Sequence, residues 1–199
     1  MNTIFAANEL DATSLNLCLR VLREGGIICY PTETFYALGI DPWNERARTR
    51  LYELKQRSEE KEFPLIVADQ AMLQEFCDVK YEALKRLAAR FWPGPLTIVL
   101  PSRERQTSYA VRVSPHPIAR QLSAALKGPI VSTSANLSGH NPLSNPDELP
   151  VELMGHIDIL IHAGPAKGEK LSTIVTLLED PPRILREGAV ASSEIYATL

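Results

Sequence analysis

The sequence predicts an α/β protein in which helices flank one mixed sheet. Amphipathic helical segments and short apolar runs alternate along the whole chain, which is typical of a layered α/β fold. The 199 residues are enough for one substantial core and most simply form a single domain over residues 1–199. Many of the 15 prolines lie beside expected strand ends, where ligand-binding loops are usually found.

Capping and stop signals define the expected helices. Asp11 or Thr13 can cap a first helix, which closes at Gly25-Gly26. Asn44 has the character of a cap for a second helix, and Asp69 opens a short one. Apolar residues at helical spacing predict two more helices, over residues 82–92 and 117–126.

Short apolar runs predict the strands, because turn residues bound them and they are too short for helices. They read IICYP (27–31), PLIVA (64–68), LTIVLP (96–101), AVRVS (110–114), PIVST (129–133), IDILIH (157–162), STIVTLL (172–178) and RILRE (183–187). The chain shows no internal repeat and no low-complexity linker.

Composition excludes several classes of protein. The net charge of −3 argues against holding nucleic acid by bulk electrostatics alone, although a local basic stripe is compatible with it. Cys18, Cys29 and Cys77 are too few and too scattered for a disulfide framework or a zinc site. No apolar run approaches the ~18 residues of a membrane span. We therefore expect a reduced, cytoplasmic protein without a membrane partner.

Familiar catalytic motifs are missing from the sequence. It contains no G-x-S-x-G elbow and no H-E-x-x-H pattern, so no metal-binding side chains are expected. His162 ends an expected strand and is either a general base or, in the preferred interpretation, a structural histidine. GPAKGEKLS, from Gly164, misses the Walker A pattern because it has three residues between its glycines and Glu169 before the lysine. This segment is either a solvated turn or a lid.

Two clusters have the chemistry of a binding site. In YPTETFYALG (30–39), a strand ends at Pro31 and gives way to hydroxyls and aromatic rings, which suit a base or an amino acid. The alternative is a packed loop that covers the sheet edge. In the second cluster, Lys55, Arg57 and Lys61 follow the end of a helix and can turn towards a common anion. The alternative there is a favourable interaction of these cations with the helix dipole.

A third cluster lies in VSTSANLSG (131–139). Ser134 and Asn136 alternate along the chain, so in extended backbone their side chains point the same way. A hydroxyl and an amide side by side suit a triphosphate or the edge of an adenine, and free backbone N–H groups add capacity for anions. The alternative is a serine-rich turn that caps a helix.

Taken in order, YPTETFYALG, the Lys-x-Arg of KQR, FWPGPLTIVLP, AVRVSPHP, VSTSANLSG and STIVTLLEDPPRILREGAV resemble the YrdC/YciO family of threonylcarbamoyl-AMP synthases. The resemblance extends from about Gly25 to Val190. It implies the YrdC/RibB-like fold, a twisted, mixed open sheet with flanking helices and a large concave cavity. It also implies the single-domain form, without the C-terminal accessory domain of longer members.

The resemblance implies an L-threonylcarbamoyladenylate synthase, which is a nucleotidyltransferase. Such enzymes condense L-threonine, bicarbonate and ATP into threonylcarbamoyl-AMP and pyrophosphate, and Mg²⁺ accompanies the nucleotide. A threonylcarbamoyl transferase complex then modifies the adenosine next to the anticodon of tRNA. The resemblance leaves open whether tRNA or other RNA contacts this chain directly.

The resemblance assigns roles to particular positions. Lys55 and Arg57 are the expected catalytic cations. The expected ATP contacts are Arg57, Lys61, Ser108, Ser134, Asn136 and Arg186. The expected threonine contacts are Thr34, Arg112, Thr133 and Ser172.

The sequence departs from the family pattern at two positions. Ser58 and Ala68 stand where many relatives have a proline and a threonine-binding histidine. The C-terminal half leans towards the YciO branch, so the principal alternative is a YciO-like RNA- or nucleotide-binding protein with weak or no synthase activity. A third interpretation, a carbamoyl-transfer domain, predicts carbamoyl phosphate as the substrate.

Overall fold

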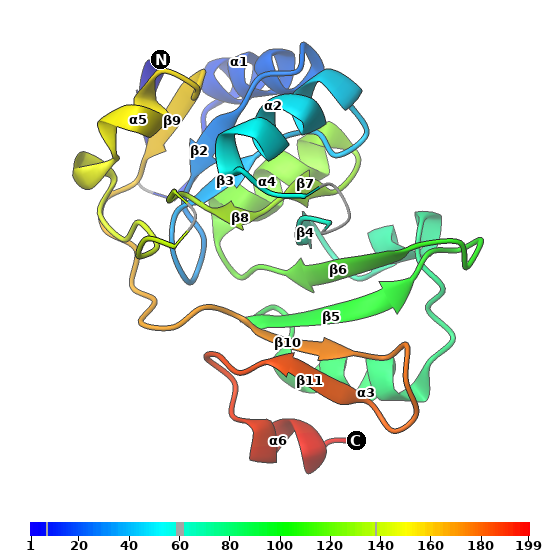
Figure 1. Cartoon of the computed structure of the whole chain (residues 1–199). Helices are drawn as coiled ribbons and strands as arrows, with labels where there is room; N and C mark the ends of the chain where they lie inside the picture. Colours follow the sequence, from blue (N-terminus) through cyan, green and yellow to red (C-terminus); the bar gives the residue numbers. More distant parts are fainter. Residues whose placement is uncertain (7, 59–61, 138) are drawn as a thin grey trace.

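The computed structural model describes residues 1–6, 8–58, 62–137 and 139–199, and its strands form two mixed sheets (Figure 1). The first sheet has the order β1 (Asn2–Phe5), β9 (Ile159–His162), β2 (Ile28–Tyr30), β3 (Ala37–Gly39), β8 (Thr133–Ser134). The second has the order β11 (Arg183–Arg186), β10 (Thr173–Thr176), β5 (Leu96–Pro101), β6 (Ser108–Val113), β4 (Leu65–Val67), β7 (Ile130–Val131). The predicted α/β class with mixed pairing is confirmed, but the strands divide between two sheets where one was expected.

Ser132 is the residue at which the chain passes from one sheet to the other. Before it, β7 pairs antiparallel with β4, and after it β8 pairs antiparallel with β3. The Ser132 backbone N–H continues the pairing with β4 by donating to Pro64 O at 2.7 Å, whereas the neighbouring Val131 N–H donates at 3.1 Å to Ile40 O, directly after β3. The single strand predicted over residues 129–133 is therefore two short strands, and the ends of both sheets meet beside Ser132.

The predicted helix caps are confirmed. Asp11 accepts a hydrogen bond from the Ser14 N–H at the start of α1 (Ala12–Arg23), and Asn44 accepts one from the Ala47 N–H at the start of α2 (Glu45–Lys55). Asp69 accepts from the Met72 N–H in the short 3₁₀ helix η1 (Ala71–Glu75). The remaining helices are α3 (Glu82–Phe91), α4 (Pro117–Leu126), η2 (Pro146–Glu148), α5 (Val151–Met154) and α6 (Ser192–Tyr196).

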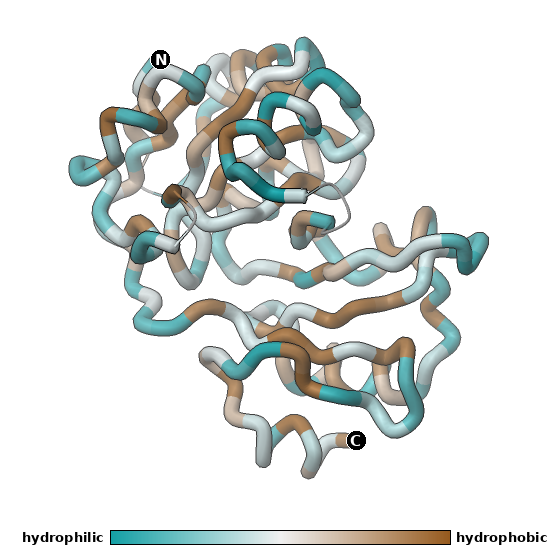
Figure 2. Tube along the Cα trace, in the orientation of Figure 1, coloured by the Kyte–Doolittle hydropathy of each residue, from teal (hydrophilic) through white to brown (hydrophobic). Residues whose placement is uncertain are grey.

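Helices cover the outer faces of the sheets. Figure 1 shows α1, α2 and α4 beside the first sheet, α3 behind β10 and β11, and α6 below the second sheet. Apolar side chains of α1 and α4 pack with those of β2 and β7 in one core cluster, and α3 packs with β5 and β10 in another. Hydrophobic residues follow β5 and β10 in Figure 2, whereas the turn between β5 and β6 is hydrophilic. The sequence did not predict β1, β3, α5 or α6, which are short.

Candidate active site

The tip of the hairpin between β2 and β3 carries the threonines of YPTET. The Thr32 hydroxyl donates to Phe35 O at 2.6 Å and accepts the Thr34 N–H at 3.2 Å, which closes a tight turn. The Thr34 side chain is buried and lies 3.1 Å, oxygen to oxygen, from that of Thr32. Because β3 pairs with β8 on its other edge, this turn lies next to Thr133 and Ser134.

The loop 164–172 lies directly on this turn. A Cβ atom at Gly168 would lie 2.2 Å from Thr34 O, so only glycine permits this approach of the two backbones. The Tyr36 hydroxyl donates to Gly164 O at 2.7 Å and accepts the Ala163 N–H at 3.0 Å. The segment predicted as a solvated turn or a lid is thus packed over the threonine-rich turn.

Lys55 ends α2 and reaches into the loop that follows β8. Its ammonium group donates to Ser134 O at 3.0 Å, to Asn136 O at 2.6 Å and to Asn136 Oδ1 at 2.8 Å. The Ser134 hydroxyl donates to the same Asn136 Oδ1 at 2.6 Å, and Asn136 Nδ2 donates to His140 O. Lys55 therefore holds the Ser-x-Asn segment in place. Its predicted contact with ATP phosphates stays a prediction.

Arg57 lies beyond the helix end, after Gln56 turns the chain with a left-handed φ of 46°. Its Nη2 donates to Glu62 O at 2.9 Å, and its guanidinium lies 4.9 Å from the centre of the Phe63 ring. This contact with the ring face leaves the polar edge of the guanidinium available to an anion. Lys61, the third predicted cation of this cluster, lies outside the described residues.

Two more arginines enter from the second sheet. Arg112 on β6 has its Nε 3.0 Å from Glu33 Oε1, and its Nη2 donates to the Ser132 hydroxyl at 3.2 Å. Arg186 on β11 donates from Nε and Nη2 to Ser172 O at 3.1 Å and 2.7 Å. The Ser172 hydroxyl is itself held by the Thr97 hydroxyl at 2.9 Å. Ser172, which was predicted to bind threonine, thus holds Arg186 in position. Ser132, which precedes the predicted Thr133, holds Arg112.

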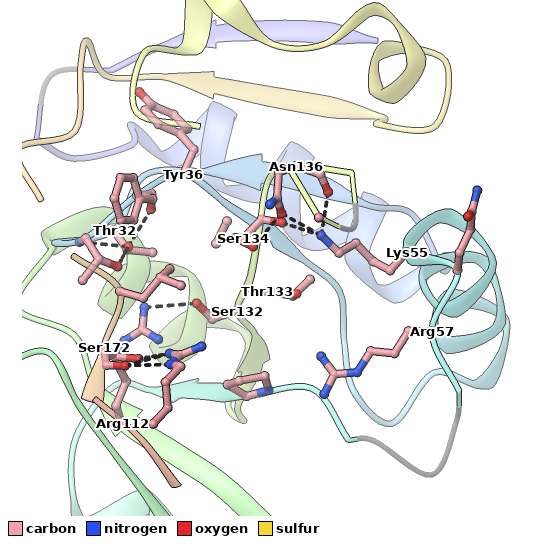
Figure 3. A pocket seen from close by; sticks show the side chains of 18 of the residues that line it. Thr32, Tyr36, Lys55, Arg57, Arg112, Ser132, Thr133, Ser134, Asn136 and Ser172 are labelled. Atoms are coloured by element: carbon pink, nitrogen blue, oxygen red, sulfur yellow. Dashed lines mark hydrogen bonds between the residues drawn. The ribbon is translucent and has the colours of Figure 1, made fainter. Parts of the chain in front are cut away.

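These groups line a single cavity of about 570 Å³ (Figure 3). Figure 3 shows Arg112 and Ser172 on one side, Lys55 and Arg57 on the other, and Ser132 and Thr133 between them. The predicted site residues that line this cavity are Thr34, Lys55, Arg57, Arg112, Thr133, Ser134, Asn136, Ser172 and Arg186. Their separation in sequence makes this gathering a property of the fold.

One predicted residue lies elsewhere. Ser108 begins β6, opposite Pro101, and is not part of the lining of this cavity, so its contact with nucleotide stays a prediction. Ala68, at the position of the family histidine, accepts a hydrogen bond from Arg120 through its carbonyl oxygen and does not line the cavity either. Sequence reasoning noted the hydroxyls of Thr32 and Ser132 within their motifs but assigned neither residue a role, and both line the cavity.

The cavity is cationic. Lys55, Arg57, Arg112 and Arg186 line it, and none of the described residues in its lining is Asp or Glu. Burial, and next the charge of Arg57, lower the pKa of Lys55 to about 8. Burial, and next the charge of Arg112, lower the pKa of Arg186. Both shifts show positive charges held close together and away from water, which is an arrangement that favours anionic ligands.

Other kinds of site are not found in the described part of the chain. No three His, Cys, Asp or Glu side chains in it are grouped closely enough to hold a metal ion. His162 contacts Asp147 at 3.0 Å and does not line the cationic cavity. None of the helices in the described ranges combines the length and the apolar character needed to cross a bilayer.

Fold and cavity together define a class of protein: an α/β domain with a cationic cavity where two sheets meet. Residues 20–188 match the Sua5/YciO/YrdC family model, which is described as "Telomere recombination". This match covers most of the chain, and the chain belongs to this family. The resemblance drawn from the motifs is confirmed.

Individual relatives agree with this assignment. The chain is 43% identical over 143 residues to a threonylcarbamoyl-AMP synthase of Methylococcus capsulatus, a match that covers 68% of this chain and 77% of the relative. Its fold superposes with a TM-score of 0.92 and 30% identity on Pyrococcus abyssi Sua5 complexed with L-threonine, covering 100% of this chain and 61% of that one. Escherichia coli YciO gives a TM-score of 0.84 at 28% identity, over 96% of this chain and 98% of YciO. The chain thus spans about three fifths of the Pyrococcus protein.

Proposed function

We propose that this chain synthesises threonylcarbamoyl-AMP from L-threonine, bicarbonate and ATP and releases pyrophosphate, as a nucleotidyltransferase. One observation carries the proposal: a single cavity joins Arg112, suited to an amino-acid carboxylate, with Lys55 and Arg57, suited to a polyphosphate. Two anionic substrates can therefore lie side by side. Support also comes from the synthase name of the Methylococcus relative and the L-threonine complex of the Pyrococcus relative.

The chemistry requires no protein nucleophile. The threonine amine takes up bicarbonate with loss of water to form a carbamate. A carbamate oxygen then bonds to the α-phosphorus of ATP, and the bond from that phosphorus to the bridging oxygen breaks to release pyrophosphate. The cavity lining contributes cations and hydroxyls, which position both reactants and stabilise charge that develops on the phosphoryl group.

Each wall of the cavity has a part in this reaction. Arg112, with Thr34, Thr133 and Ser172 nearby, would hold the amino acid, and its guanidinium matches a carboxylate. Arg57, with Ser134, Asn136 and Arg186, would hold the nucleotide. The loop 164–172 would keep water from the reactive mixed anhydride, since Gly168 already lies on the Thr34 turn.

The cavity fits a Mg²⁺ ion only as part of the nucleotide. Mg²⁺ prefers carboxylate, phosphate and water oxygens, and the described lining offers cations, hydroxyls and amides but no carboxylate. The ion would therefore be held through ATP phosphates, where it neutralises charge on the leaving pyrophosphate. The neutral hydroxyls of Ser134 and Thr133 are compatible with the water shell of such an ion.

The product defines the further partners that we propose. Threonylcarbamoyl-AMP is an activated acyl group, so a transferase complex that modifies tRNA next to the anticodon would consume it. We place the reaction in the cytoplasm, which is supported by three buried cysteines that form no disulfide.

Pyrophosphate release tests the proposal. We expect release from ATP and bicarbonate to depend on L-threonine, and Arg57→Ala to lower kcat/KM by about 10²-fold, because Arg57 would stabilise charge in the transition state. Arg103→Ala, at an exposed arginine outside the cavity, is the matched control. Release without threonine, or an unaffected Arg57→Ala enzyme, would contradict the proposal. Salt-dependent RNA binding without pyrophosphate release would support the YciO-like alternative.

A further inference from the structure

Glu33 is the acidic residue of the YPTET turn, and its carboxylate makes an ion pair through one oxygen and accepts a hydrogen bond through the other. Its Oε1 lies 3.0 Å from Arg112 Nε, and the two side chains are only 11% and 5% exposed. Its Oε2 accepts a hydrogen bond from the Ser114 hydroxyl, which in turn accepts the His116 backbone N–H at 3.1 Å. The carboxylate is therefore held from behind by the end of β6 and cannot rotate freely.

Glu33 approaches Arg112 from the side opposite the substrate cavity. Arg112 lines the 570 Å³ cavity, whereas Glu33 does not and instead borders two neighbouring hollows. Glu33 takes the Nε of the guanidinium, and Ser132 accepts from Nη2. These two contacts, one an ion pair and one a hydrogen bond, hold the Arg112 guanidinium at the cavity wall.

The Glu33–Arg112 ion pair also offsets the repulsion between two positive charges. Arg186 lies close enough to Arg112 for the Arg112 charge to lower its pKa. Arg112 is buried and Arg186 is half-buried, so the repulsion between their like charges is only partly screened by water. Glu33 is the carboxylate that the structure places against Arg112, so it offsets this repulsion and keeps Arg112 in the wall.

We propose that Glu33 is a positioning residue, which acts through Arg112 to orient the guanidinium for the carboxylate of the amino-acid substrate. The inference rests on the proposed function for the identity of that substrate. It gives the glutamate of the YPTET turn a part in amino-acid recognition without direct contact with the reacting atoms.

Removal of the Glu33 charge should lower the affinity for L-threonine selectively and leave the affinity for ATP unchanged. Removing the Glu33 charge leaves Arg112 beside Arg186 with its orientation undetermined, while Lys55, Arg57 and the Ser-x-Asn segment across the cavity are unchanged. If the ion pair were purely structural, its loss would destabilise the whole protein and weaken the binding of L-threonine and of ATP together.

The experiment measures KM for L-threonine and for ATP in the wild type and in Glu33→Gln, with calorimetry of threonine binding. We expect the KM and the Kd for threonine to rise about tenfold, since the lost interaction is a close, buried ion pair with Arg112. The KM for ATP should stay within about twofold of the wild type. Glu82→Gln, in an exposed pair with Lys85, is the control and should change none of these values.

A second, milder variant tests the same inference in case Glu33→Gln does not fold. Ser114→Ala keeps both charges and removes only the hydroxyl that holds Glu33, so it should raise the KM for threonine by a few-fold. Equal losses for both substrates, unchanged threonine affinity, or tighter threonine binding in Glu33→Gln would each overturn the inference. Tighter binding would mean that Glu33 competes with substrate for Arg112.

Failure of the proposed function would look different. A wild-type protein without threonine-dependent pyrophosphate release would refute the synthase reaction. Calorimetry needs no turnover, and it would still show whether Glu33→Gln changes the affinity of the cavity for L-threonine.

Discussion

Replacing Lys55 by methionine should loosen the Ser-x-Asn segment while leaving α2 intact. Methionine keeps the length and apolar stem of the side chain but removes all hydrogen bonds from Nζ. The bonds lost are those to Ser134 O, Asn136 O and Asn136 Oδ1, at 3.0, 2.6 and 2.8 Å, although Asn136 Oδ1 still accepts the Ser134 hydroxyl. These bonds join the end of one helix to a loop about 80 residues further along the chain, so their loss separates two walls of the cavity.

The expected size of the effect follows from two opposing contributions. Hydrogen bonds from a charged donor contribute about 1.5–3 kcal/mol each, so three of them give roughly 5 kcal/mol at the low end. Burial, and next the charge of Arg57, oppose this, because together they lower the pKa of Lys55 from 10.5 to about 8, which corresponds to a penalty of roughly 3 kcal/mol on the charged form. The net loss in Lys55→Met is then about 2 kcal/mol, or a fall in Tm of about 4–8 °C for a chain of this size.

The same group gives a pH signature that the variant should lack. The unfolded chain keeps the Lys55 proton up to its ordinary pKa of 10.5, whereas the folded chain releases it near 8. Between these values the unfolded state binds more protons, so this group makes the folded state more stable as the pH rises. Activity should move the opposite way, because a neutral amine has neither the charge nor the third donor for the Ser-x-Asn segment.

Thermal unfolding and pyrophosphate release across pH 7–10 measure both effects. We expect wild-type kcat/KM for ATP to decline above pH about 8 and Lys55→Met to be low throughout, with a lower Tm. Lys80→Met, at an exposed lysine, is the control. A Lys55→Met protein with wild-type Tm and wild-type KM for ATP would refute the reasoning that Lys55 holds this segment.

Two further predictions concern local structure. Gly168→Ala places a Cβ atom 2.2 Å from Thr34 O, so the loop must move. We expect a raised KM for threonine and faster hydrolysis of the adenylate, which product analysis would measure. An unchanged yield of the adenylate would contradict this prediction. Asn44→Ala removes the cap of α2, where Asn44 accepts the Ala47 N–H at 3.1 Å, and should lower the unfolding free energy by about 1 kcal/mol with KM values unchanged. A denaturation curve superimposable on that of the wild type would contradict the second.

Sequence reasoning was most successful where the signal is local. The cap at Asn44 and the helix Pro117–Leu126 follow from residues within one turn of each other, so no distant contact was needed to recognise them. The short strands β1 and β3 were missed, because three or four residues carry little periodicity and are strands only through their partners. The split at Ser132 was missed for the same reason: an apolar run does not show which sheet each half will join.

The sequence by itself determined the α/β class, the caps of α1 and α2 and the residue types of the site, since these caps and motifs such as YPTET and Ser-x-Asn are contiguous. Only the tertiary structure decided how these motifs act on one another. It directs the Lys55 ammonium to the Ser134–Asn136 backbone, places Glu33 behind Arg112, and lays Gly168 on the Thr34 turn. Each of these contacts joins residues far apart in the chain, and their distances depend on sheet pairing that no local pattern encodes.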